Sequence, residues 1–589
     1  MMKPLLLAAA IALPATAALA LDTAPTRPAP FHHSGKPSVL SEVEKADYRE
    51  IFRAIRGGEW SNAAARIDAL QDRQLQSAAR AELYLAKGSP VVSLEELTAL
   101  LAQAPELPQA AQLARLAETR GAIGLPELPE AQSLFWAGEQ PRRARARGTS
   151  GDPLAAELDA EVQPLIVEDQ PAAAEALLNA REYALTPEAR TEFQQRIAWS
   201  YYLTGNNVAA RMLAGKARAG SGEWALHAAW TAGLASWRLG DCAAASDAFA
   251  TVGGRSADAE MMAAGNYWAA RADMLCARPE RVQARLRTAA RLKETFYGLI
   301  AARALGIRDP GRGDLHDYRD AEWRPIARKA NVRTAIALAE IGETGLADEF
   351  IRHQAKISPA DHDALLHLAD DLSLPWTQFW LAHNAPRGAR INMAARYPAP
   401  DWRPSKGWRI DKSLVFAHAL QESSFRTQVV SPAGATGVMQ VRPGTAGDIA
   451  RSRGEYFEAG QLRDPAANIE FGQSYIEYLR DYPGTGGLLP KVIAAYNAGP
   501  SPIAEWNTRH MDRGDPLLYI ESIPYWETRG YVPIVLRNYW IYEQKAGKDS
   551  ASRTALAQGM WPRFPGLPGA AAVRMQTPVT TSASTQGGD

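Results

Sequence analysis

The chain has 589 residues, more than one hydrophobic core usually organises, so about two to four domains are expected. Its 65 basic and 65 acidic residues balance, which argues against nucleic acid or an anionic membrane as the main partner.

The N-terminus has the pattern of an export signal. Lys3 precedes an apolar run from Leu5 to Leu13, and Ala18-Leu-Ala20 offers a small-residue cleavage site, so residues 1–20 are predicted to be a signal peptide. A membrane anchor is the alternative, which Pro14 disfavours. No cysteine lies near this site and no later stretch is long and apolar enough to cross a bilayer, so we expect membrane association to be at most peripheral.

Residues 41–304 show apolar residues at helical spacing. Aromatic and small-residue helices alternate with glycine turns and alanine-rich helices, as in Trp230 to Trp237, Leu239-Gly240 and Ala243 to Phe249. This order is typical of stacked α-repeats and predicts an α-superhelical solenoid. The sequence leaves open whether the solenoid closes into a ring.

Two features of this region carry further expectations. Cys242 and Cys276 are the two cysteines of the chain, which in an exported protein favours one disulfide over two buried free thiols. Such a bond would stabilise the fold by roughly 3–4 kcal/mol. The basic run from Pro141 to Arg147 is expected to be a solvated loop, with contact to an anionic polymer as the alternative.

The rest of the chain divides by composition. Residues 305–396 are helical but more charged, and predict a helical linker domain. Pro and Gly residues up to Gly407 mark a boundary, after which the motifs cluster in residues 407–548. Residues 562–589 are rich in Gly, Pro, Ala, Thr and Ser and are expected to form a disordered tail. The predicted fold class is all-α.

The most informative motif is Ala419-Leu-Gln-Glu-Ser-Ser-Phe425. Ser413 can cap a helix that runs to about Ser424, and apolar residues on all sides of it indicate a packed helix. A charged, unpaired Glu422 would be costly there. It either stays protonated near neutral pH or pairs with Arg426 or another cation, and spacing alone leaves both interpretations open.

The loop that follows favours the first interpretation. Ser431 and Gln440 can form hydrogen bonds without adding charge, and Met439 offers an apolar contact, a mixture that suits a sugar. Three glycines let the backbone turn tightly and approach a ligand: Gly434, Gly437 and Gly444.

Two later segments complete the set. The run from Val492 to Pro500 predicts a helix with Tyr496 and Asn497 in its last turn, where a capped helix with a core tyrosine is the alternative. Glu527 either pairs with a cation such as Arg529 or holds a substrate hydroxyl.

Together and in this order, these four segments resemble the catalytic domain of the soluble lytic transglycosylases, exported bacterial enzymes that cut the glycan strands of peptidoglycan. The resemblance covers about Ile410 to Ala546. The helical region before it, with Thr295-Phe-Tyr-Gly298, is similar to the larger members, in which a superhelical ring and a linker domain carry a lysozyme-like domain. The resemblance implies a periplasmic location and glycan strands as the partner, and leaves protein partners unknown.

The resemblance also implies residue roles. Glu422 would act as the sole acid and base, protonating the bond between N-acetylmuramic acid and N-acetylglucosamine and then taking a proton from the 6-hydroxyl of the same muramoyl sugar. Attack by that hydroxyl gives a 1,6-anhydro product. Tyr496 would steady positive charge on the ring, Ser431 and Gln440 would line the groove, and Glu527 would bind substrate. Close relatives place an apolar groove residue where this chain has Arg442, which bears on one sugar or peptide contact.

Two other functions are weighed against this one. A lysozyme-type hydrolase usually needs a second acid, and Asp448, Glu470 and Glu477 are predicted to lie on solvated helix faces. A peptidoglycan-binding scaffold without activity is disfavoured by the intact set of motif residues. The chain has no phosphate-binding loop, zinc-ligand spacing or calcium loop, so no cofactor is expected.

Overall fold

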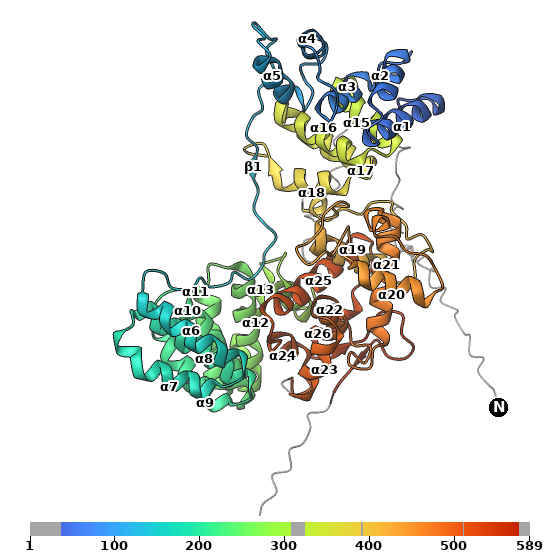
Figure 1. Cartoon of the computed structure of the whole chain (residues 1–589). Coiled ribbons are helices and arrows are strands. Elements are labelled where there is room, and N and C mark those ends of the chain that lie inside the picture. The colour runs from blue at the N-terminus through green and yellow to red at the C-terminus, as the bar shows by residue number, and fades with distance from the viewer. Residues whose placement is uncertain (1–36, 308–323, 390–392, 510–511, 576–589) are drawn as a thin grey trace, which may run out of the picture. The chain divides into compact units, whose positions relative to one another are not determined.

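The computed structural model describes residues 37–307, 324–389, 393–509 and 512–575 (Figure 1). Helices α1 to α26 dominate it, and the strands in these ranges form two short antiparallel ladders, β1–β2 and β3–β4. The predicted all-α fold class is confirmed. The predicted signal peptide, residues 1–20, lies outside the described residues. The described residues all fall within one contact unit, Gly35–Asp589.

The first helices share a hydrophobic core with helices that follow residue 324. Glu340 ties the two stretches together, because its carboxylate accepts hydrogen bonds from the backbone N–H groups of Val39 and Leu40. The helices of this core are α1 (Glu42–Arg56), α2 (Trp60–Ala69), α3 (Gln76–Leu85), α4 (Leu94–Gln103), α5 (Ala110–Thr119), α15 (Ala330–Ile341), α16 (Thr344–Ile357), α17 (His362–Asp371) and α18 (Pro375–His383).

The chain leaves this core through residues 120–152, which are largely extended (Figure 1). Within them β1 (Phe135–Trp136) pairs with β2 (Asn384–Ala385), and Trp136 stacks on His383. The described helices between residues 41 and 304 therefore contribute to two different cores.

The second core begins with helices that pack on their sequence neighbours, as expected of a solenoid. Small residues allow the close approach: a Cβ at Gly233 would lie 2.5 Å from the Phe249 ring. These helices are α6 (Pro153–Val167), α7 (Pro171–Arg181), α8 (Pro187–Leu203), α9 (Asn207–Arg218), α10 (Trp224–Arg238), α11 (Cys242–Arg255), α12 (Ala259–Leu275), α13 (Pro279–Ala290) and α14 (Phe296–Ala304).

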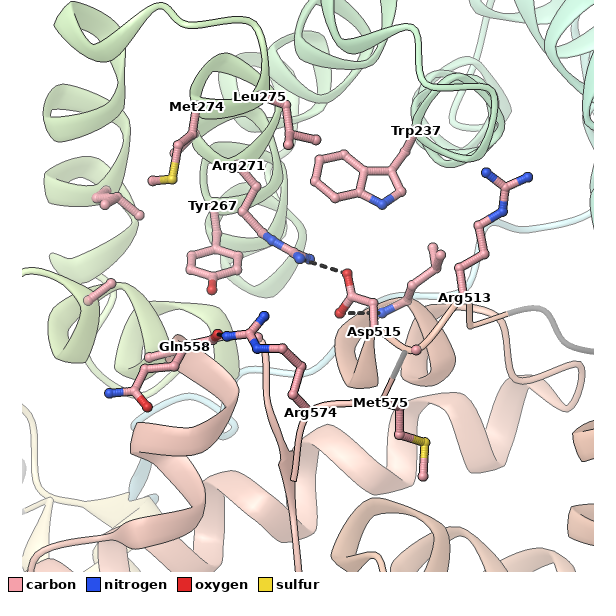
Figure 2. Close-up of a pocket in the computed structure, with 17 residues that line it drawn as sticks. Trp237, Tyr267, Arg271, Met274, Leu275, Arg513, Asp515, Gln558, Arg574 and Met575 are labelled. Atoms are coloured by element: carbon pink, nitrogen blue, oxygen red, sulfur yellow. Dashed lines mark hydrogen bonds and ion pairs between the residues drawn. The ribbon is translucent and has the colours of Figure 1, made fainter. Parts of the chain in front are cut away.

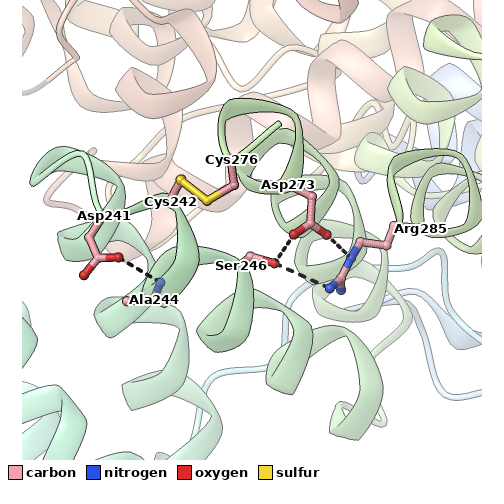
Figure 3. Close-up of a disulfide and its surroundings, with 7 residues drawn as sticks. All are labelled: Asp241, Cys242, Ala244, Ser246, Asp273, Cys276 and Arg285. Carbon is pink, nitrogen blue, oxygen red and sulfur yellow. Dashed lines mark hydrogen bonds and ion pairs between the residues drawn. A yellow bond between two sulfur atoms is a disulfide. The ribbon is translucent and has the colours of Figure 1, made fainter. Parts of the chain in front are cut away.

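The expected disulfide is present. It joins Cys242, the first residue of α11, to Cys276, which follows α12 (Figure 3). Beside it, Asp273 is fully buried, accepts a hydrogen bond from Ser246 and pairs with Arg285 of α13. The bond and this ion pair fasten three successive helices of the solenoid.

The same core continues into the segment that carries the motifs. Its elements are α19 (Lys412–Ser423), α20 (Pro443–Ser452), α21 (Pro465–Asp481), α22 (Leu489–Ala498), α23 (Pro500–Thr508), α24 (Pro516–Glu521), α25 (Trp526–Lys545), α26 (Ala551–Ala557), β3 (Trp561–Pro562) and β4 (Ala572–Val573). Helix α25 packs against both α19 and α22, so one long helix supports the two helices on which Glu422 and Tyr496 lie.

Buried polar contacts join this segment to the solenoid. Glu521, at the end of α24, has no exposed surface; its carboxylate accepts two hydrogen bonds of 2.6 Å from Arg143 and one from the Tyr297 hydroxyl. The next residue, Ser522, is hydrogen-bonded to Tyr202 and Arg238.

Two expectations are corrected here. The basic run is not wholly solvated, because Arg143 is largely buried against Glu521, while Arg142, Arg145 and Arg147 are exposed. The tail does not begin at Pro562, because β3 pairs with β4. The apolar Trp561 and Phe564 are buried and anchor this ladder, and residues 576–589 lie outside the described part. Within the described ranges, no helix combines the length and hydropathy needed to span a bilayer.

Candidate active site

Glu422 lies in the last turn of α19. The helix is capped by Asp411, whose carboxylate accepts from the backbone N–H of Ser413, so the expected cap at Ser413 is wrong by two residues. The helix ends because Ser424 and Phe425 adopt left-handed backbone conformations, with φ of 52° and 65°. Its apolar residues are buried on all sides, as expected.

The carboxyl group of Glu422 accepts a 2.6 Å hydrogen bond from the Tyr531 hydroxyl. Burial raises the pKa of Glu422 to about 7, and the negative charge of Glu527 acts in the same direction, while the hydrogen bond from Tyr531 opposes them. The alternative pairing with Arg426 is not formed, because that guanidinium donates to the Ser423 carbonyl and lies over the Trp376 ring.

Two buried rings extend this contact. His418, one turn before Glu422, is hydrogen-bonded through Nδ1 to the Tyr531 hydroxyl at 2.8 Å, and its ring lies 4.5 Å from that of Tyr496. Burial lowers the pKa of His418 to about 3, so this imidazole is neutral near pH 7. Burial and the nearby Glu422 raise the pKa of Tyr496 and of Tyr531 well above their usual range. Glu422 is therefore hydrogen-bonded to the neutral hydroxyl of Tyr531, which is itself hydrogen-bonded to the neutral imidazole of His418.

The loop after α19 folds on itself through two bridges, in which Thr436 pairs with both Val430 and Val441. Ser431 accepts a hydrogen bond from the Ala435 backbone N–H and stays partly exposed. Gly437, with φ of 77°, leaves no room for a side chain, since a Cβ would lie 2.2 Å from the Leu462 carbonyl. Gly434 also has positive φ, whereas Gly444 lies in the first turn of α20 and makes no tight turn.

Met439 and Gln440 have different surroundings. The Met439 side chain is fully buried and its sulfur packs against Gly472, so its surroundings in this structure are protein atoms, and its apolar contact with a ligand stays a prediction. Its backbone carbonyl accepts a 2.8 Å hydrogen bond from the Tyr496 hydroxyl. Gln440 is partly exposed, and its amide donates to the carbonyls of Val429 and Gly437.

Asn497 joins α22 to the start of α25. Its amide donates to the carboxylate of Glu527 at 3.2 Å, and its carbonyl accepts from Thr528. Glu527 is exposed and pairs with this amide rather than with Arg529, which is held by the Ile523 carbonyl and the Trp199 ring. The hydrogen bond from Asn497 therefore holds the Glu527 carboxylate in place, while the Glu527 side chain stays exposed to solvent.

The three other acids that the sequence analysis weighed as a second catalytic carboxylate are paired with arginines. Glu470 is buried between Arg409 and Arg453, so the expected solvated face is wrong for this residue. Glu477 also pairs with Arg409, and Asp448 pairs with Arg451 at the surface. Of the acids in the segment, Glu527 is the one whose charge acts on Glu422.

A pocket of about 970 Å³ opens beside this cluster. Gln421, Glu527 and Tyr531 line one side of it, and Arg142 and Arg145 of the extended segment line another. Within the described residues, no group of three or more His, Cys, Asp or Glu side chains is arranged to hold a metal ion.

Sequence reasoning missed two of these features. The link from Tyr531 to Glu422 could have been suspected, because Glu527 and Tyr531 are four residues apart and lie on one face of a helix. The contact of Arg142 and Arg145 with the same pocket had no signal in the sequence, because they lie about 280 residues from Glu422.

Comparison with known proteins gives consistent results for this segment. Residues 403–518 match the family model described as the transglycosylase SLT domain. The soluble lytic murein transglycosylase of Escherichia coli strain K12 is 42% identical over 136 residues, which are 23% of this chain and 21% of that protein. The protein of the same name from Salmonella typhimurium is 39% identical over 151 residues, 25% of this chain and 23% of that protein. The aligned part is thus less than a quarter of these relatives' length.

The fold likeness extends further. The crystal structure of the 70 kDa soluble lytic transglycosylase from Escherichia coli superimposes with a TM-score of 0.53 and covers 88% of this chain and 99% of that chain. The sequence identity is 19% over this superposition, so the likeness concerns the fold of the helical regions.

Proposed function

We propose that the chain, whose residues 403–518 match the transglycosylase SLT domain, belongs to the soluble lytic transglycosylase family and cleaves the bond between N-acetylmuramic acid and N-acetylglucosamine in peptidoglycan. In this proposal residues 407–548 form the catalytic domain, and the enzyme acts in the periplasm on glycan strands. The product carries a 1,6-anhydro-muramoyl end.

One observation carries this proposal: Glu422 has a pKa of about 7 and a hydrogen bond to a neutral hydroxyl. A carboxyl group with this pKa is partly protonated at neutral pH, and can both give and take a proton there. As an acid, Glu422 protonates the glycosidic oxygen. As a carboxylate, it then removes the proton from the 6-hydroxyl, whose oxygen attacks the anomeric carbon and closes the anhydro ring without water.

The neighbouring residues are assigned supporting roles. Tyr496 steadies positive charge on the sugar ring, and the Met439 carbonyl holds its hydroxyl in place. Ser431 and Gln440 bind polar groups of the sugar, and Glu527, positioned by Asn497, accepts a hydrogen bond from a sugar hydroxyl.

Product analysis tests the proposal. Purified peptidoglycan is digested with the native protein and with Glu422→Gln, and the released muropeptides are weighed by mass spectrometry. We expect anhydro-muropeptides from the native protein and a loss of at least about 1000-fold in rate for the variant. Near-normal release by Glu422→Gln would refute the assignment of this residue.

The same experiment separates a second function, that of a lysozyme-type hydrolase, whose products have a reducing muramic end and are heavier by one water. Pairing of Glu470 and Glu477 with arginines argues against either of them as the second free carboxylate that a retaining hydrolase usually needs about 5 Å from the first, so Glu527 is the remaining candidate for that role.

A further inference from the structure

A second pocket, of about 940 Å³, lies apart from the candidate active site (Figure 2). One side is formed by α10, α12, α13 and the end of α14, and the other by residues 513–518, 557–559 and 574–575. None of the residues proposed to bind or cleave glycan lines it.

Much of the pocket wall is apolar, and part of it is open to solvent. Tyr267 and Trp237 face the pocket from α12 and α10 (Figure 2). Met274 and Leu275, at the end of α12, are 63% and 65% exposed and give the pocket an accessible apolar surface. Met575, near the end of the described chain, also lines the pocket.

Three arginines line the same pocket. Arg271 forms an ion pair of 2.6 Å with Asp515, and its guanidinium lies over the Trp237 ring at 4.7 Å. Its second terminal nitrogen, Nη1, is buried and lacks a hydrogen-bond partner among the described residues. Arg513 and Arg574 add two positive charges to the wall, while Asp515 is the one acid that lines it.

From these observations we propose that this pocket binds a short peptide with a free carboxylate. The carboxylate meets the excess of guanidinium groups, and small apolar side chains of the peptide rest on the tyrosine, tryptophan and methionine surfaces. Resting on the proposed function, the peptide belongs to the stem peptides that peptidoglycan carries. The site would sense peptide away from the glycan groove.

The position of the pocket gives the bound peptide a structural effect. Asp515 caps α24, and Leu518 of α24 also lines the pocket. After α24, the chain passes through Glu521 and Ser522, which the solenoid holds, to Glu527. A peptide in the pocket contacts both α12 and α24. It therefore strengthens the packing of α24 on the solenoid, and this packing fixes the position at which α25 begins.

Calorimetric titration tests the site. The probe is diacetyl-L-lysyl-D-alanyl-D-alanine, and the protein is the Glu422→Gln form, which removes turnover from the measurement. Ala304, at the pocket rim, is changed to Trp to fill the space; Arg574→Gln removes one charge from the wall without filling it. The matched control is Arg145→Gln, which removes an exposed arginine from the other pocket.

We expect Ala304→Trp and Arg574→Gln each to weaken binding at least about 5-fold, the C-terminal amide of the probe to bind about 10-fold more weakly, and Arg145→Gln to change little. No binding up to about 10 mM probe would overturn the proposal, as would equal affinity for acid and amide. If circular dichroism shows that Ala304→Trp is misfolded, the affinity of Arg574→Gln for the probe tests the site instead. Digestion of peptide-free glycan strands by the native protein is measured separately. If the strands are cleaved but the probe does not bind, the peptide site is refuted while the proposed function stands.

Discussion

The hydroxyl of Tyr531 donates a 2.6 Å hydrogen bond to Oε1 of Glu422. The tyrosine is buried in α25 and lies 109 residues after Glu422 of α19, so the proton affinity of Glu422 depends on how these two helices pack. This hydrogen bond lowers the pKa of Glu422, whereas burial and Glu527 raise it to about 7.

Opposing effects on one pKa give a matched pair of variants. Tyr531→Phe removes the hydrogen bond that stabilises the carboxylate, and is expected to move the basic limb of kcat/KM to higher pH. Glu527→Gln removes the negative charge and is expected to move it to lower pH. In the native protein that limb is expected near pH 7, the pKa of Glu422. Profiles on soluble glycan strands measure both shifts, and shifts of the same sign would contradict this assignment of charges.

Glu422→Gln is expected to stabilise the protein in a pH-dependent way. The folded-state pKa of about 7 lies above the ordinary value of 4.5, so the native fold loses stability as pH rises between these values and the carboxyl group ionises. The glutamine avoids this cost. Its advantage should grow from near zero at pH 4.5 to about 1–3 kcal/mol above pH 7. Burial also raises the pKa of Glu260 and of Glu543 to about 7, so the quantity to measure by urea unfolding is the difference between variant and native protein.

Removing the carboxylate of Glu521 is expected to weaken the contact between α24 and the solenoid. Glu521→Gln leaves Arg143 without its ionic partner in a buried position, at a cost of about 3–5 kcal/mol. Tyr297→Phe removes one neutral donor to the same carboxylate and should cost less, about 1.5–3 kcal/mol. Denaturant unfolding of both variants and of the double variant measures the difference; equal costs would argue against the ion pair as the main contact.

Gly437→Ala is expected to destabilise the loop that carries Gln440, because φ is 77° and a Cβ would lie 2.2 Å from the Leu462 carbonyl. A loss of about 2–4 kcal/mol in stability and a matching loss of glycan affinity are expected. Gly444→Ala is the control, since its Cβ would meet nothing within 4 Å. Thermal unfolding distinguishes them, and a neutral Gly437→Ala would show that the loop can adjust.

Reducing the disulfide is expected to lower stability by roughly 3–4 kcal/mol. Cys242→Ser combined with Cys276→Ser gives the same change without reductant. The loss should appear in urea unfolding of the solenoid, while the rate of glycan cleavage at low temperature stays near the native value.

Much of the fold and the cluster around Glu422 could be predicted from local patterns, because helix periodicity and short motifs are encoded by neighbouring residues. Asn497 and Glu527, which the sequence motifs assign to the same site, are hydrogen-bonded to each other in the structure. The burial of Met439 could not be foreseen, since it depends on α21, where Gly472 makes room for the sulfur. Nor could the pairing of Glu470 with two arginines, because each comes from a different part of the chain.

The core formed by α1–α5 is completed only by α15–α18, and the intervening residues build a different core. The N-terminal helices are therefore synthesised first, but their apolar faces stay uncovered until the chain has been synthesised to about residue 395. Folding of this region is expected to be slow and to depend on assistance that keeps those faces from aggregating, which makes truncated forms ending before residue 330 poor candidates for expression.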